Sequence, residues 1–229
     1  MDGNFDEIGE ALTVFSDRRE TAKLSDYALL IIPSRAAPGY KRAEADRIVK
    51  FVEQGGGLLI CGCFYRGPHG WYSNAAMNTL TDAFGVRLEN DSICDPAHNA
   101  MNAPRFPLFT QITPHAITQG VRAFQSKGMA SLRLLDEKLK PLIVSDPDSY
   151  RLVSRWQRED KPNLPVMIAL ERGKGRVAIM GDGQWMLPDY LPQADNVRLF
   201  ANLTSWLTHG KARQLDDVAI RNVLKRFEF

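Results

Sequence analysis

The chain has 229 residues, with 29 Lys and Arg against 27 Asp and Glu, 44% hydrophobic residues and three cysteines. A formal charge of +2 indicates neither a nucleic-acid nor an anionic-membrane partner, because such binding needs clustered cations. An odd number of cysteines argues against a disulfide framework. No window approaches roughly 18 consecutive apolar residues, and the first residues lack the basic-then-apolar order of a signal peptide, so we expect a cytoplasmic protein.

The first half of the chain predicts a strand, a helix and a second strand. Residues 28–32 form a continuous apolar run closed by Pro33, which is typical of a strand buried on both faces. Residues 41–54 carry apolar side chains at helical spacing, and three glycines then end the helix before the apolar run 58–61. This order favours a parallel pair of strands with a right-handed crossover.

A further helix is expected over residues 74–84, with Gly85 at the position of a C-terminal cap. Residues 91–109 show little periodicity, and three prolines prevent a long helix there. We interpret this segment as an extended excursion over the surface, a kind of loop that often carries function.

The second half predicts more strands and a final helix. Short strands are expected at residues 131–135 and 141–144, and the runs 166–170 and 176–180 predict a β-hairpin with a five-residue connection. The sheet is therefore expected to be mixed, with an antiparallel portion.

The last helix should start near Asp195 and Asn196, either of which could cap it, and end at Gly210. We expect one domain over residues 1–208, a length that buries a core without disulfides or a structural metal. An amphipathic tail is expected over 209–229. The apolar face of the tail covers the domain or meets a partner, and packing is the favoured interpretation.

Five segments of the chain form a recognisable series. They are LSDY before LLIIP at residues 24–33, FVEQGGGLLI at 51–60, PHAITQGV at 114–121, GKGRVAIMGD at 173–182, and DNVRLFANLTSWL at 195–207. In this order they resemble the class I glutamine amidotransferase-like superfamily, and the closer likeness is to its non-amidotransferase branches of the trehalose-utilisation (ThuA-like), gliding-motility and intraflagellar-transport types. PHAITQGV is similar to the branches' HPIT-x-GV segment, with Ala116 in place of the usual proline.

The resemblance implies an α/β fold, a flavodoxin-like three-layer sandwich whose mostly parallel central sheet has an antiparallel hairpin near the C-terminal part. Domains of this superfamily open with a strand and a helix, whereas only residues 5–15 precede the first clear strand here. We therefore expect the opening strand to be missing, or the chain to be a fragment or a late start.

The resemblance also poses the question of a cysteine nucleophile. A true amidotransferase of this class places a cysteine at a strained turn after a central strand, where its pKa is lowered. Cys61 is expected in the core, and Cys63 is the better nucleophile candidate, although Tyr65 stands where the turn would want glycine. The His-Pro-Glu segment of these enzymes is replaced by GDGQW at residues 181–185, so we expect no glutaminase activity.

Other chemistry has weaker support. Cys94, Asp95 and His98, with His115 downstream, could in principle hold zinc or iron, but Cys94 suits a strand end and His115 a helix-entry turn. We expect neither a metal nor a cofactor, since the glycine run at 55–57 precedes a strand instead of following one, the wrong order for a phosphate loop.

His69 lies on a glycine-rich loop with Trp71 and Tyr72, where aromatic side chains could stack on a sugar or a base, or simply pack the loop down. Asp182, directly after a buried strand, is either a ligand contact or a cap for the following turn, with the cap favoured.

Ligands of open α/β sheets bind outside the carboxyl ends of the parallel strands. The candidate ligand-binding residues there are Ser34, Arg35, Gly62, His69, Asp95, Asp182, Gly183 and Trp185, and the one candidate catalytic residue is Cys63. We expect a non-catalytic domain that binds a small molecule, for example a carbohydrate, or a protein, without nucleic-acid or membrane partners. The alternatives are a hydrolase using Cys63 or an acid/base site around Asp182, and a structural module of a larger assembly or homo-oligomer.

Overall fold

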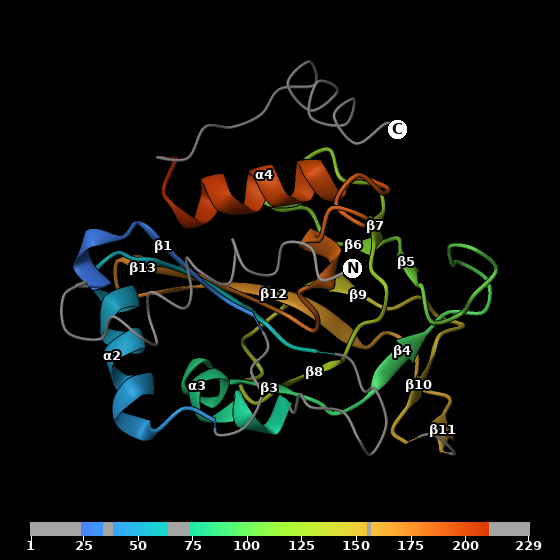
Figure 1. The fold of residues 1–229 in the computed structure, drawn as a ribbon, viewed down its shortest axis with the longest axis horizontal. Coiled ribbons are helices and arrows are strands. Elements are labelled where there is room, and N and C mark those ends of the chain that lie inside the picture. Colours follow the sequence, from blue (N-terminus) through green and yellow to red (C-terminus); the bar gives the residue numbers. More distant parts are fainter. Residues whose placement is uncertain (1–23, 34–38, 64–73, 155–156, 211–229) are drawn as a thin grey trace.

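The computed structural model describes residues 24–33, 39–63, 74–154 and 157–210 (Figure 1). A six-stranded sheet in the order β1-β2-β13-β12-β9-β6 forms its centre. The strands, in that order, are Leu29–Ile32, Gly57–Cys61, Gly175–Met180, Pro165–Arg172, Pro141–Val144 and Gln111–Ile112. The strands expected at 28–32, 58–61 and 141–144 are confirmed.

The sheet is mixed. β1, β2 and β13 pair in parallel, whereas β12 is antiparallel to both β13 and β9, and β9 is antiparallel to β6. β1, β2, β13 and β9 therefore run one way, and β12 and β6 run the other. The predicted hairpin is present, but its connection is only Gly173 and Lys174, because Arg172 still pairs with Gly175 and Gly173 takes a φ of 59°.

Helices lie on both faces of the sheet. In Figure 1, α4 (Asn196–Leu207) lies above it, and α2 (Arg42–Glu53) and the short α3 (Asn78–Thr81) lie below. Side chains alternate between the two faces along β2. Leu58 and Ile60 join the core between the sheet and α2, whereas Leu59 and Cys61 join the core between the sheet and α4. The described residues contain three α-helices, so we describe a mixed α/β fold and not a full three-layer flavodoxin sandwich.

The expected helix over residues 74–84 is broken into η2 (Asn74–Ala76), α3 and η3 (Asp82–Phe84). The Asn78 amide accepts from Leu88 N and donates to Leu88 O, which ties this segment to the end of β3. Gly85 ends the segment with a φ of 74°, as its place after the last apolar residue predicts.

The excursion over residues 91–109 is more ordered than the sequence indicates. It contains β4 (Ser92–Cys94), which pairs with β10 (Tyr150–Leu152), and β10 in turn pairs with β11 (Arg158–Glu159). It ends in β5 (Leu108–Phe109), paired with β7 (Phe124–Gln125). A further ribbon joins β3 (Val86–Leu88) to β8 (Leu132–Leu134), within the expected strand 131–135.

The N-terminus of α4 differs from the expected cap. Neither Asp195 nor Asn196 caps the helix with its side chain. Instead the Asp195 carboxylate accepts hydrogen bonds from Arg122 N and Ala123 N, at 2.8 and 3.2 Å, and Asn196 Oδ1 accepts one from Gln125 N. The two side chains therefore attach the 122–125 segment to the helix.

Two expectations fall outside the described ranges: the amphipathic tail over 211–229 and the question of an opening strand before residue 24. The remaining described elements are η1 (Leu24–Asp26) and η4 (Gln184–Met186). No helix in the described ranges is both long and apolar enough to cross a bilayer.

Candidate functional site

The carboxyl ends of β2, β13 and β9 meet at one edge of the sheet. Met180 pairs with Cys61 on one side and with Met167 on the other, and Pro165 pairs with Val144 at the end of β9. The polar residues that follow these strands therefore lie along one line, which we call the carboxyl edge. Its members are Gly62 and Cys63 after β2, Gly181, Asp182 and Gly183 after β13, and Ser145 and Asp146 after β9.

Cys63, the candidate nucleophile, lies directly beyond β2 with 8% of its surface exposed. Its backbone N–H donates to Asn74 Oδ1 at 2.8 Å, and its carbonyl accepts from Asn74 Nδ2 at 2.7 Å. One buried side chain therefore fixes both backbone polar groups of Cys63. The Cys63 N–H, the kind of donor that stabilises an oxyanion, is already used.

Gly62 and Gly183 hold the same edge closed. Gly62 N donates to Met180 O at 2.8 Å, and a Cβ at Gly62 would come within 2.8 Å of Gly181 O. A Cβ at Gly183 would come within 3.1 Å of Cys61 Cβ. The two glycines permit close approach of the strand ends, and the space beside them is filled by protein.

Cys61 is a core residue, as its position in the strand predicts. Its thiol is fully buried, and burial, helped by the nearby charge of Asp182, raises its pKa far above the ordinary value. A thiol held in its neutral form is neither a nucleophile nor a strong metal ligand.

Asp182 is 1% exposed. Its Oδ2 accepts a hydrogen bond from Gln184 N at 2.9 Å and from Ser126 Oγ at 3.2 Å, so the carboxylate holds the turn that starts η4 and ties it to the loop before β8. These bonds match the capping role that the sequence favours.

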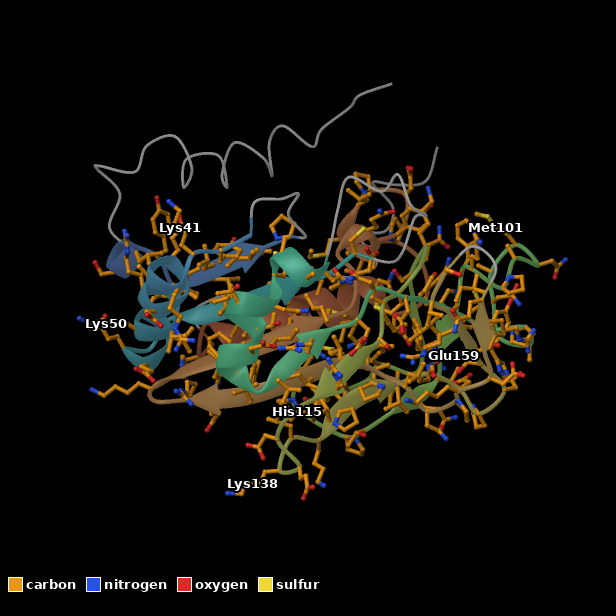
Figure 2. All side chains as sticks on the ribbon, turned by 90° about the horizontal axis from the view of Figure 1, so that it is seen from below. Lys41, Lys50, Met101, His115, Lys138 and Glu159 are labelled. Carbon is orange, nitrogen blue, oxygen red and sulfur yellow. The ribbon has the colours of Figure 1, made fainter. Side chains whose placement is uncertain are left out.

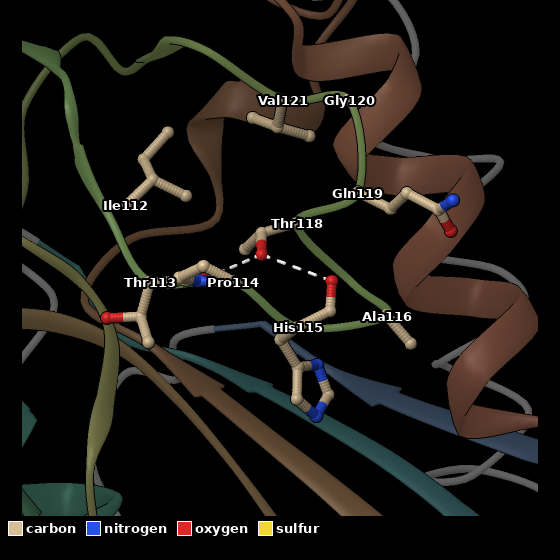
Figure 3. Close-up of a pocket in the computed structure, with 9 residues that line it drawn as sticks. All are labelled: Ile112, Thr113, Pro114, His115, Ala116, Thr118, Gln119, Gly120 and Val121. Atoms are coloured by element: carbon tan, nitrogen blue, oxygen red, sulfur yellow. Dashed lines mark hydrogen bonds between the residues drawn. The ribbon is translucent and has the colours of Figure 1, made fainter.

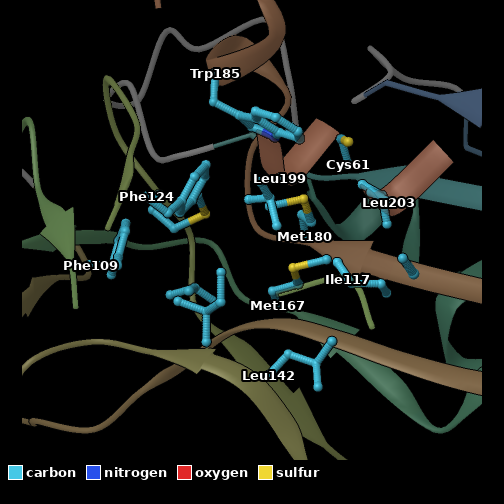
Figure 4. Close-up of a cluster of buried hydrophobic side chains, with 14 of the residues drawn as sticks. Cys61, Phe109, Ile117, Phe124, Leu142, Met167, Met180, Trp185, Leu199 and Leu203 are labelled. Carbon is cyan, nitrogen blue, oxygen red and sulfur yellow. The ribbon is translucent and has the colours of Figure 1, made fainter. Parts of the chain in front are cut away.

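Trp185 lies in the core beneath α4, where its ring meets Phe124 edge-on at 5.4 Å and Phe200 at 6.0 Å (Figure 4). It is fully buried, and its indole Nε1 has no hydrogen-bond partner among the described residues.

Asp95 lies at the end of β4, 2% exposed. Its Oδ1 accepts from Ala97 N and His98 N at 2.9 and 2.6 Å. Burial raises the pKa of this carboxyl group, the two hydrogen bonds oppose the rise, and the neighbouring Asp148 and Asp146 add to it. Three carboxylates therefore approach one another beside Asp146, at the β9 end of the carboxyl edge.

His98 lies next to these carboxylates, with 3.2 Å between its Nδ1 and Asp146 Oδ2. The Asp146 side chain is 1% exposed, while that of His98 is 55% exposed. Asp146 also accepts from the Thr110 hydroxyl at 3.1 Å, which connects the carboxylate to the residue just before β6. A buried carboxylate that orients a solvent-facing imidazole is an arrangement found in both catalytic and metal sites.

The metal ligands considered from sequence are only partly brought together. Asp95 and His98 are adjacent, and Asp148 joins them. Cys94 points elsewhere, with Sγ 4.0 Å from Ser92 O and a pKa raised by burial.

His115 lies at the opposite end of the sheet. Its ring meets Trp206 edge-on at 5.2 Å, and Arg176, near the start of β13, donates to Trp206 O. Burial lowers the pKa of His115, and Arg176 lowers it further. Figure 2 shows His115 well apart from Met101, which lies on the loop after β4.

A shallow open depression of about 420 Å³ lies beside His115, formed by residues 112–121 under α4 (Figure 3). It coincides with the PHAITQGV segment, whose turn is closed by Thr118 Oγ1 donating to Thr113 O at 2.7 Å. The depression is at the other end of the sheet from the carboxyl edge, so it is not the site that the strand ends predict.

Three candidate ligand-binding residues, Ser34, Arg35 and His69, lie outside the described residues. Conversely, sequence reasoning missed Asn74, Asp146 and Asp148. The two aspartates directly follow the correctly predicted strand 141–144, and the rule that marked Asp182 after β13 would have marked them too. Nothing in the sequence pattern distinguishes Asn74 from an ordinary helix-start residue.

No protein-family model matches the sequence, and no curated protein matches it. Solved structures do match. The mmIFT52 N-terminal domain is similar with a TM-score of 0.64 and 17% identity, over 87% of this chain and 90% of that one. The cytoplasmic protein STM1381 from Salmonella typhimurium LT2 is similar with a TM-score of 0.50 and 15% identity, over 80% and 73% of the two chains.

A putative ThuA-like protein from Bacteroides uniformis ATCC 8492 also matches, with a TM-score of 0.49 and 15% identity, over 90% and 85%. At these identities the likeness shows the fold alone. The likeness to the mmIFT52 N-terminal domain agrees with the expected α/β fold of the intraflagellar-transport type.

Proposed function

We propose that residues 24–208 belong to a non-catalytic binding domain of the class I glutamine amidotransferase-like superfamily, from its ThuA-like and intraflagellar-transport branches, without glutaminase activity. The five sequence segments support the superfamily, and the likeness to the mmIFT52 N-terminal domain supports the fold. The observation that carries the proposal is the closure of the β2 end around Cys61 and Cys63.

A cysteine nucleophile needs an exposed thiolate, a base and an oxyanion donor. Here the Cys63 side chain is almost fully buried, and its N–H is bonded to Asn74. Of the histidines in the described ranges, His98 lies 3.2 Å from Asp146 Oδ2, His115 packs on Trp206 at the far end of the sheet, and His209 follows α4. This arrangement supports a binding function over the alternative of a Cys63 hydrolase.

Among the described residues, Asp95, His98 and Asp148 lie beside Asp146 of the carboxyl edge. His98 and Asp148 are exposed there and offer polar groups to a partner. We assign ligand or protein contacts to these residues. Carboxylates and an imidazole suit the hydroxyl groups of a carbohydrate or the amides of a protein loop.

The test is release of glutamate from glutamine by the full chain and by two matched variants, Cys63→Ser and Cys94→Ser. Cys94 is also a buried thiol next to a strand end, which makes it the control. We expect no release above buffer from any of the three proteins. Turnover that Cys63→Ser abolishes and Cys94→Ser keeps would establish the hydrolase alternative and overturn the proposal.

A further inference from the structure

Asp95, His98 and Asp148 bring three potential metal ligands together near the Asp146 end of the carboxyl edge. One ligand atom from each of these residues lies within 4.8 Å of the other two. They come from separate segments, since Asp95 and His98 follow β4 whereas Asp148 follows β9. The fold, and not sequence proximity, assembles the set.

The imidazole is oriented from behind by a residue outside this set. His98 Nδ1 lies 3.2 Å from Asp146 Oδ2, a contact that favours a proton on Nδ1 and so leaves Nε2 as the nitrogen for a metal. Asp146 is itself fixed, because it is buried and accepts hydrogen bonds from both the hydroxyl and the backbone N–H of Thr110. This carboxylate–histidine pair is the usual outer support of a metal-binding imidazole.

The 95–99 turn contains two further acceptor atoms. The N–H groups of Ala97 and His98 both donate to Asp95 Oδ1, and no hydrogen bond to Asp95 Oδ2 is found among the described residues. On the residue after His98, Asn99 Oδ1 is buried and has no hydrogen-bond partner among the described residues, while its Nδ2 donates to Asp95 O. A buried acceptor without a donor is costly unless a cation or water satisfies it.

We propose that His98, Asp95 and Asp148 bind one divalent transition-metal ion, with Asp146 as the positioning residue for His98. One imidazole nitrogen with two carboxylate oxygens suits Mn²⁺, Fe²⁺ or Zn²⁺, whereas Mg²⁺ and Ca²⁺ favour sets made of oxygen alone. Three protein ligands leave at least one coordination position open to water or to a ligand oxygen. The inference does not depend on the absence of glutaminase activity.

The test uses the full chain, freed of metal with a chelator. Mn²⁺ is the probe, because it binds weakly to the thiols of the buried cysteines. Calorimetry should find one Mn²⁺ per chain, and the electron spin echo of the bound ion should show coupling to a single imidazole nitrogen. His98→Gln should remove that coupling, and His98→Gln and Asp148→Asn should each weaken binding more than tenfold. Asp146→Asn should weaken it by about 10- to 100-fold.

The matched control is Asp136→Asn, an exposed carboxylate on the loop after β8 that accepts only from Lys138 N among the described bonds. Thermal unfolding of every variant checks that it folds, and binding by Asp136→Asn should equal that of the wild type. The proposal is overturned if Mn²⁺ shows no saturable binding below about 1 mM. It is equally overturned if binding survives both site substitutions, if the bound ion shows no nitrogen coupling, or if Mg²⁺ binds as tightly.

Discussion

Asn74 and Cys63 are joined by two hydrogen bonds, one in each direction. The Asn74 amide accepts from Cys63 N at 2.8 Å and donates to Cys63 O at 2.7 Å, and the same Nδ2 donates to Glu89 O at 2.6 Å. The residue that would be a nucleophile in an amidotransferase is thus fixed between η2 and the end of β3. The β2 end is built as a structural junction.

Replacing Asn74 with Ala should destabilise the fold by about 2–4 kcal/mol, because three buried backbone groups lose their partner. It should also speed alkylation of Cys63. Urea unfolding and mass-resolved alkylation measure the two effects. The control is Thr79→Ala, at an exposed position one turn along, which should change stability by less than about 0.5 kcal/mol. An Asn74→Ala protein as stable as this control would show that the junction is not structural.

His115 should make stability depend on pH. Its pKa is lowered in the folded state by burial and by Arg176, so below its ordinary value of about 6.5 the unfolded chain binds the extra proton first. The contribution is complete above that pH and is lost as the pH falls toward the folded pKa. His115→Gln should therefore flatten the loss of unfolding free energy between about pH 7.5 and pH 5.5. An unchanged slope in the variant would contradict this assignment.

The glycines after β13 should differ in their tolerance of alanine. A Cβ at Gly181 would run into the backbone carbonyl of Ala130, whereas at Gly183 the contact is 3.1 Å to Cys61 Cβ. We expect Gly181→Ala to cost about 3 kcal/mol or more and Gly183→Ala about 1 kcal/mol, measured by denaturant unfolding. Equal costs would mean that the two strand ends do not approach as closely as described.

α4 holds the segment from residue 117 to 125 by side-chain bonds, and not by apolar packing alone. Asn202 Nδ2 donates to Ile117 O and Gln119 O, at 3.1 and 2.9 Å, next to the depression described above. Asn202→Ala should cost about 1–3 kcal/mol, since two carbonyls lose their donor. Faster amide exchange in residues 116–121 than in α2 would locate the effect, and exchange that is unchanged there would contradict it.

Strands and helices could be predicted wherever the spacing of apolar residues agreed with the Gly and Pro residues that end elements. The run at 28–32, the amphipathic helix ending at three glycines and the strand at 58–61 each satisfy two signals at once, and α2 begins and ends within a residue or two of its expected limits. β4 and β10 could not be found this way. Each is three residues long and exists because it pairs with the other across about 60 residues of chain.

The positions of the strand ends were predictable, whereas the side chains that meet there were not. Gly62, Asp95 and Asp182 follow β2, β4 and β13, as residues after apolar strands should, and their role in binding a ligand stays a prediction. Whether each side chain is free to contact a ligand depends on its burial, which long-range contacts such as the hydrogen bond from Ser126 to Asp182 determine. The pairing of His98 with Asp146, 48 positions apart, leaves no trace in local pattern.

Closure of the β2 end to cysteine chemistry can be measured by the alkylation rates of Cys61, Cys63 and Cys94 in the native protein as a function of pH. We predict that all three react far more slowly than free cysteine from about pH 6 to pH 9, with no inflection below the ordinary thiol pKa of about 8.5. Rapid alkylation of Cys63 with an apparent pKa well below 8.5 would contradict this closure and favour the alternative of a hydrolase that uses Cys63.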